Sequence, residues 1–287
     1  MEIITMENLQ EIELPKNLEI YRDKIEASIK PYLEIELKQS KRPRWWHSKF
    51  GGLPYLPKGY DYPKNNNGEY LYLLAQINFK QTPRLQGFPD RGILQFYIYP
   101  DDTYGMKFGS TESVEDFQEG ILLNAQQDHF RVIYFPEFSL NIDDLITDFS
   151  FLPTIEELDY YFPIEGCCAI CCSLQSSPIS IRDYQFDIFP QDELSEDIYE
   201  SLYDQYYDDI PHGGHQIGGY PDFTQEDPRY SFEKDHDPYI LLFQMDTDSN
   251  DKIDIMWGDC GICNFFIKKS ALAKLDFSQV LYNWDCS

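Results

Sequence analysis

The sequence is poor in basic residues. Lys and Arg number 23 against 50 Asp and Glu, which leaves a formal net charge of -27 over 287 residues. A protein that binds nucleic acid needs a Lys- and Arg-rich surface that displaces counterions from phosphates. The composition therefore excludes nucleic acid as the expected ligand. It favours a basic protein partner, if there is one, although hydration alone also explains an acidic surface.

Signals for membranes and secretion are missing as well. Nowhere do about 18 apolar residues follow one another, as a membrane-spanning helix requires. The first residues, MEIITMENLQEIELP, lack the positive and apolar regions of a secretory leader. The 7 cysteines are an odd number, which suits reduced thiols better than a disulfide framework. We expect a cytoplasmic protein that does not contact a membrane.

The motifs of common enzyme classes are absent too. The sequence has no G-x-S-x-G elbow, no P-loop and no dinucleotide-binding fingerprint. Acyl transfer, nucleotide hydrolysis and hydride transfer therefore lack support, and we expect no cofactor. A non-enzymatic binding or interaction module is the favoured hypothesis, and catalysis remains an open alternative.

What the sequence does contain is enough apolar material for a core, with 42% hydrophobic and 16% aromatic residues. Residues 15–40 predict a helix that Pro31 ends, followed by a strand in which Leu33, Ile35 and Leu37 alternate with charged residues. Further short, aromatic-rich segments predict strands at 71–77, 93–99, 130–135, 167–174, 240–246, 253–257, 264–267 and 280–283. Helical patterns are fewer, at 155–160, 191–205 and after Ser270. The fold class is mainly β with a few helices (α+β), in one domain over 1–287.

The second half of the sequence repeats the first. Three pairs of segments recur in the same order, at offsets of 167, 168 and 169 residues: GGLP with GGYP, YLYLLAQIN with YILLFQMD, and GILQFYI with GICNFFI. Such a unit is too long for a solenoid, whose repeats run about 20 to 50 residues. We therefore predict duplicated β half-domains, at about 32–140 and 165–287, that pack about a pseudo-twofold axis. An acidic, Tyr-rich insertion occupies 187–211.

The repeated glycine pairs predict structural corners. Gly51 and Gly52, like Gly218 and Gly219, suit positive φ or a close backbone approach. A phosphate-binding loop would also need a following helix and a Lys, which both places lack. A ligand site is expected where the two halves meet. Its candidate residues are Trp45, Trp46, Gln76, His215, Gln244, Trp257 and Asp259.

Six segments carry a family resemblance: SKFGGLPYLP, LLAQINF, FPDRGILQFYI, GGHQIGGYPDFTQEDPR, LLFQMDTD and IMWGDCGICNFFI. They resemble the signature segments of the YwqG-like family, a bacterial domain of unknown function, over about Ile25 to Cys286. The resemblance implies a largely β, duplicated fold in a cytosolic bacterial protein. It does not imply an activity, and it provides no catalytic residues to carry over. Some relatives are encoded near polymorphic toxins, which implies an alternative role as an immunity protein against a basic toxin.

Two patterns suggest a metal, and each has a simpler explanation. DTDSNDKID at 246–254 opens like a calcium loop but lacks its glycine and its final Glu, so a polar hairpin turn is favoured. A metal-assisted enzyme remains an alternative, with Asp246, Asp248, Asn250 and Asp254 or the HGGH at 212–215 as ligands. CCAICC at 167–172 reads as an apolar strand, where i and i+3 thiols face opposite sides, so structural thiols are favoured over zinc.

The stretch YESLYDQYYDDI at 199–210 combines tyrosines with carboxylates. Tyr is enriched in interfaces because it joins a rigid apolar ring to a polar tip. The candidate protein-interaction residues are Tyr199, Tyr203, Tyr206 and Tyr207. An exposed insertion between the halves is the alternative, and the oligomeric state is left open.

Overall fold

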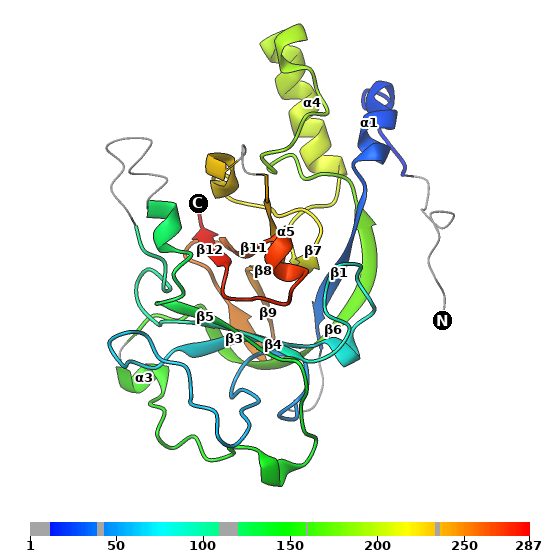
Figure 1. The fold of residues 1–287 in the computed structure, drawn as a ribbon. Helices are drawn as coiled ribbons and strands as arrows, with labels where there is room; N and C mark the ends of the chain where they lie inside the picture. The colour runs from blue at the N-terminus through cyan, green and yellow to red at the C-terminus, as the bar shows by residue number, and fades with distance from the viewer. Residues whose placement is uncertain (1–11, 39–42, 109–119, 159, 233–235) are drawn as a thin grey trace.

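Two strands that are far apart in the sequence pair at the centre of the structure. In the computed structural model, β1 (Lys30–Leu37) and β6 (Ile164–Ser177) run antiparallel, with Lys30 opposite Ser177 and Leu37 opposite Ile170. The structure describes residues 12–38, 43–108, 120–158, 160–232 and 236–287. They form a 12-stranded sheet in which the observed pairings are antiparallel, so the mainly β class is confirmed (Figure 1).

Four strands follow on each side of this central pair. Beside β6, in outward order, lie β2 (Lys49–Gly51), β3 (Tyr72–Asn78), β4 (Ile93–Ile98) and β5 (Phe130–Phe135). Beside β1, in the same way, lie β7 (His215–Gly218), β8 (Tyr239–Asp246), β11 (Ile262–Lys268) and β12 (Val280–Asp285). A hairpin of β9 (Asp248–Asn250) and β10 (Ile253–Ile255) pairs with the first residues of β6.

Short helices surround the sheet. The α-helices are α1 (Arg22–Ala27), α3 (Ile155–Leu158), α4 (Glu196–Asp209) and α5 (Lys269–Leu272). The 3-10 helices are η2 (Glu19–Tyr21), η3 (Phe79–Gln81), η4 (Ile142–Asp144), η5 (Gln191–Glu193) and η6 (Pro228–Phe232). Helices α1 and α4 lie together at one end of the molecule, where Ile25 shares an apolar cluster with Leu202 and Tyr206 (Figure 1).

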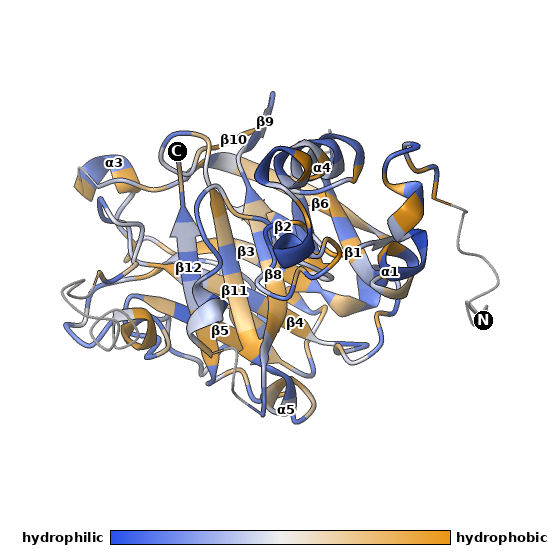
Figure 2. Ribbon diagram, turned by 90° about the horizontal axis from the view of Figure 1, so that it is seen from above, coloured by the Kyte–Doolittle hydropathy of each residue, from blue (hydrophilic) through white to orange (hydrophobic). Residues whose placement is uncertain are grey.

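The core lies between the two sides of the curved sheet. The ring of Phe96 on β4 lies 4.6 Å from that of Phe243 on β8 and 4.9 Å from that of Phe265 on β11. The outermost strands also approach each other, because the rings of Phe130 on β5 and Tyr282 on β12 are 5.4 Å apart. Figure 2 shows hydrophobic segments along β4 and β8 in the middle of the sheet. Burial of these rings is the main favourable contribution to folding.

The sequence patterns located most strands correctly. The long ones, such as β3, β8 and β11, were expected because their apolar runs are bounded by turn residues. Strands β2, β7 and β9 were not expected, since segments of three or four residues are too short to show a period of two. The predicted hairpin turn after β9 is confirmed at residues 251–252.

Matching hydrogen bonds recur on the two sides of the sheet. The Oε1 atom of Gln76 accepts from the backbone N–H of Tyr55, and that of Gln244 accepts from the N–H of Asp222, both at 2.7 Å. Strand β3 skips one residue, at position 74, in its pairing with β4, and β8 skips one at position 242 in its pairing with β11. These matches support the predicted duplication. The duplication and its axis stay predictions, which superposition of residues 48–98 on 215–267 would test.

The glycine pairs occupy the conformation that the sequence suggested. Gly51 and Gly52 have φ of 63° and 71°, and Gly218 and Gly219 have φ of 70° and 72°. Space is also short, because a Cβ on Gly51 would lie 2.5 Å from the carbonyl oxygen of Gly166. The left-handed backbone and the close approach together require glycine there.

The variant Gly51→Ala tests this requirement, with Gly59→Ala as its matched control. Gly59 also has a positive φ, 89°, but a Cβ there would meet nothing within 4 Å. We expect Gly59→Ala to lower the free energy of unfolding by about 1 to 2 kcal/mol, the backbone contribution alone. We expect a further loss of about 1 to 3 kcal/mol in Gly51→Ala, from overpacking against a backbone atom. Denaturant unfolding measures both, and equal losses would contradict the steric argument.

Candidate functional site

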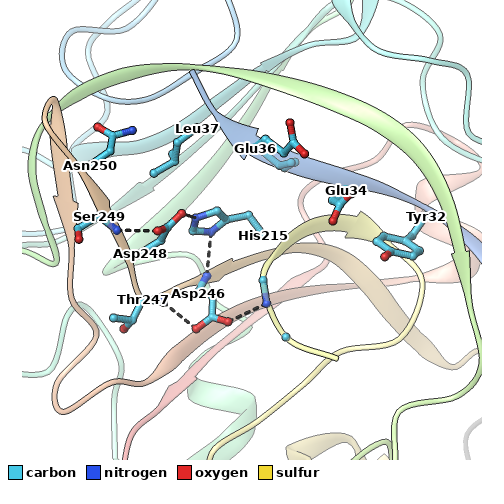
Figure 3. Close-up of a pocket in the computed structure, with 13 residues that line it drawn as sticks. Tyr32, Glu34, Glu36, Leu37, His215, Asp246, Thr247, Asp248, Ser249 and Asn250 are labelled. Atoms are coloured by element: carbon cyan, nitrogen blue, oxygen red, sulfur yellow. Dashed lines mark hydrogen bonds and ion pairs between the residues drawn. The ribbon is translucent and has the colours of Figure 1, made fainter. Parts of the chain in front are cut away.

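A pocket opens where the short strand β7 ends. Strand β7 pairs with β1 from Tyr32 to Ile35, but β1 continues to Leu37. Gly213 and Gly214, with φ of 75° and 76°, turn the chain away before β7 can follow β1 further. The gap between the end of β1 and the β8–β9 connection is a pocket of about 380 Å³ (Figure 3).

The lining of this pocket is acidic. Four carboxylates belong to it: Glu34 and Glu36 on β1, Asp246 at the end of β8 and Asp248 on β9. The remaining lining residues are Tyr32, Ile35, Leu37, Gly213, Gly214, His215, Thr247, Ser249 and Asn250. No Lys or Arg is among them, so the pocket has a negative potential. Larger hollows exist elsewhere, including one of about 950 Å³ beside β12, but that one also contains Arg182 and Lys107.

His215 is buried, and the hydrogen bonds of its ring define its tautomer. Its Nδ1 atom accepts from the backbone N–H of Asp246 at 3.0 Å, so Nδ1 carries no proton. The Nε2 atom lies 3.3 Å from Oδ2 of Asp248 and therefore donates its proton to that carboxylate (Figure 3). The ring also packs edge-on against Phe50, with centroids 4.9 Å apart. His215 thus links the backbone of Asp246 to the carboxylate of Asp248.

Backbone donors hold the two Asp carboxylates in place. The carboxylate of Asp246 accepts from the N–H of Gly214 and from that of Thr247, each at 2.7 Å. The carboxylate of Asp248 accepts from the N–H of Ser249 at 2.7 Å as well as from His215. The hydrogen bond from His215 lowers the pKa of Asp248 below its ordinary value, because it stabilises the charged form. Both groups are therefore ordered anions.

This arrangement is better suited to holding a cation than to acid–base chemistry. Both ring nitrogens of His215 are already engaged, so the imidazole is not available as a general base. The hydroxyl of Thr247 donates to the carbonyl oxygen of Gly261 at 2.9 Å, so it is not placed as a nucleophile. Carboxylates fixed in position bind a cationic group without first losing side-chain freedom.

The corresponding place on the other side of the sheet is filled by the chain itself. The backbone N–H of Ile170 on β6 donates to the carbonyl oxygen of Ser48 at 3.3 Å, just beyond β2. The N–H of Ser48 in turn donates to the side chain of Gln81 at 2.8 Å, and Asn78 donates to the carbonyl oxygen of Trp46 at 2.7 Å. The place beside β2 that corresponds to the pocket is therefore closed by the chain.

The residues predicted to line one ligand site do not converge. His215 lines the pocket, and Gln244 lies behind it, where its amide donates to the carbonyl oxygen of Gly214 at 2.8 Å. Gln76 is fully buried and donates to the carbonyl oxygen of Trp45 at 2.7 Å. The others lie apart from the pocket: Trp45 stacked on Phe149, Trp46 near His47, Trp257 buried against Tyr104, and Asp259 exposed. The two tryptophans belong to a segment rich in Lys and Arg, KQSKRPRWWHSK at 38–49, of which residues 39–42 lie outside the described residues.

Three of the four residues of the metal alternative do meet in the pocket. Asp246, Asp248 and Asn250 line it, whereas Asp254 lies on β10 opposite Ser249 and is exposed. Across the described ranges, no three His, Cys, Asp or Glu side chains are grouped so that they could hold a metal ion. The glutamates of β1 were missed, because their alternation with Leu33 and Ile35 looks the same for any half-exposed strand.

The tyrosines of α4 and the cysteines of β6 mainly serve packing. Tyr206 is buried and donates to the carbonyl oxygen of Ile179 at 2.8 Å, so its hydroxyl is not available to a partner. Tyr199, Tyr203 and Tyr207 are half-buried. Cys168 is buried, and burial raises the pKa of Cys172 to about 12, which keeps that thiol protonated.

The fold and the pocket define a mainly antiparallel β protein with an acidic recess beside the central strand pair. The chain belongs to the family described as domain of unknown function DUF1963, which matches residues 48–286. Strand β1 precedes the matched range, so Glu34 and Glu36 are contributed from outside it, whereas His215, Asp246 and Asp248 lie within it. None of the curated proteins matches the sequence. The described helices include none that is both long and apolar enough to cross a membrane.

The pH dependence of stability tests the contact between His215 and Asp248. The folded pKa of Asp248 lies below its unfolded value, so its stabilisation is present above about pH 4 and is lost as pH falls through the folded pKa. Asp248→Asn should therefore lower the free energy of unfolding at pH 7, and the difference from the native protein should shrink at lower pH. The exposed neighbour Asp251, changed to Asn, is the control. A difference that stays constant down to pH 2 would contradict the contact.

Proposed function

We propose that this protein is a non-enzymatic binding module that receives a positively charged side chain of a protein partner in the pocket beside β7. The observation that carries the proposal is a lining with four carboxylates and no Lys or Arg. Glu34, Glu36 and Asp246 are not involved in any ion pair among the described residues, and Asp248 is paired only with the imidazole of His215. The pocket therefore has uncompensated negative charge that a Lys or Arg side chain would balance.

Simple electrostatics favours such a ligand. Two opposite charges about 4 Å apart near a protein surface attract with about 4 kcal/mol before desolvation is subtracted. A guanidinium group adds geometry, because its planar fork forms two parallel hydrogen bonds to a carboxylate. The carboxylate of Asp248, held by Ser249 and His215, offers a fixed acceptor for it.

The charge of the whole chain supports the same class of partner. A net charge of -27 produces a long-range negative potential, which raises the encounter rate with a basic protein and falls as salt is added. Membership of the YwqG-like family, bacterial origin and a cytoplasmic location remain parts of this proposal.

Binding of N-acetyl-arginine amide, measured by isothermal titration calorimetry, tests the proposed function. We expect Glu36→Gln and Asp248→Asn each to weaken binding about tenfold, which corresponds to about 1.4 kcal/mol. Asp61→Asn removes an exposed carboxylate on the other side of the sheet and serves as the control, with unchanged affinity. The uncharged analogue N-acetyl-citrulline amide should not bind. Equal affinities of all variants, or equal binding of the two analogues, would refute the proposal.

A further inference from the structure

The backbone of β1 has a free edge inside the pocket. The N–H of Lys38 donates to the carbonyl oxygen of Ala169 on β6 at 2.8 Å. Backbone groups of successive residues in a strand point alternately to its two neighbours. Glu34 and Glu36 therefore direct their N–H and C=O groups toward β6, like Lys38, whereas Ile35 and Leu37 direct theirs toward β7.

Strand β7 does not reach far enough to pair with Leu37. Its first residue, His215, lies opposite Ile35, so the next position on that side, opposite Leu37, would be residue 213. The chain has turned away there, since Gly213 and Gly214 both have positive φ. No strand among the described residues pairs with Leu37 on this side, and Leu37 itself lines the pocket. Its N–H and C=O groups therefore face the recess.

We infer that the partner binds as an extended segment that adds a short strand beside Leu37 and places a Lys or Arg side chain toward Asp248. The inference rests on the proposed function, since the charged lining selects the basic side chain. Addition of a strand to an open sheet edge is an established mode of peptide recognition, in which backbone hydrogen bonds supply affinity and side-chain pockets supply specificity. An open edge of this kind is otherwise prone to unspecific pairing.

The register of the added strand follows from the sheet geometry. Directly opposite residues of antiparallel strands place their side chains on the same face. The place opposite Ile35 is taken by His215, and Gly214 follows it, so the first open position on this side is the one opposite Leu37. A residue there places its side chain on the face of Ile35 and His215, where Asp248 lies, and this is the position for the basic residue. The same residue exchanges both of its backbone hydrogen bonds with Leu37.

A pair of labelled peptides tests strand addition on the native chain. The first is a fluorescein-labelled pentapeptide Gly-Val-Arg-Val-Gly, and the second carries an N-methyl group on Arg, which removes the N–H that would donate to Leu37. Fluorescence anisotropy should show that the first peptide binds at least about tenfold more tightly than N-acetyl-arginine amide binds. The methylated peptide should bind no better than that single-residue probe.

Variants at Leu37 give a second measurement. Leu37→Pro removes the N–H that faces the recess and leaves the bonds to β6, which come from Glu36 and Lys38, untouched. It should weaken the first peptide about tenfold, whereas Leu37→Ala, which keeps the N–H, should bind within about twofold of the native protein. If Leu37→Pro does not fold, the methylated peptide on the native chain still decides.

The outcomes separate the two proposals. Equal binding of the methylated and unmethylated peptides would overturn strand addition, while sensitivity of N-acetyl-arginine amide to Asp248→Asn would leave the proposed function standing. Failure of that single-residue probe to bind at all would overturn the proposed function itself. Tight binding of the unmethylated peptide alone, lost in Leu37→Pro, supports both.

Discussion

The pairing of β1 with β6 is the constraint on which the rest of the structure depends. Each of these strands has the sheet's other strands on its second side, so their shared ladder joins two four-stranded sets into one core. The ladder covers all of β1 up to Leu37, whereas the second neighbour of β1 stops at Ile35. The same strand therefore supports the fold along one edge and exposes part of the other edge.

Hydrogen bonds from backbone N–H groups, more than those from side chains, hold the Asp carboxylates of the recess in place. Amide N–H groups at the turns around β7 and β9 fix the carboxylates of Asp246 and Asp248, and the buried ring of His215 links the two segments. The hydrogen-bonded imidazole orients the carboxylate of Asp248. The turns around β7 and β9 therefore hold the carboxylates of Asp246 and Asp248 in fixed positions, and they place this negative charge in one recess.

Local patterns were sufficient for the class of fold but not for the site. The apolar runs around Leu74 and Leu242 predict buried strands, because turn residues flank each run on both sides. The site instead needs the pairing of β1 with β7 and the end of β7 at His215, and both are long-range features. His215 and Asp248 were each considered for separate reasons, yet nothing in the chain between them predicts their hydrogen bond. Glu36 could not be distinguished from any solvated residue of a half-buried strand.

The two sides of the β1–β6 pair differ in whether the chain fills the place beyond the short neighbouring strand. This difference affects how many partner sites one chain can offer under the proposed function. Beside β6, the segment around Ser48 occupies the place just before the short strand β2, and a hydrogen bond to Gln81 holds it there. Beside β1, the Gly213–Gly214 turn leaves the matching place empty of chain. A scaffold with such similar flanks would suggest two equivalent docking positions, but the chain fills the place beside β6 that corresponds to the pocket. Under the proposed function, each polypeptide offers this site once, and clustering of partners would require association of several copies.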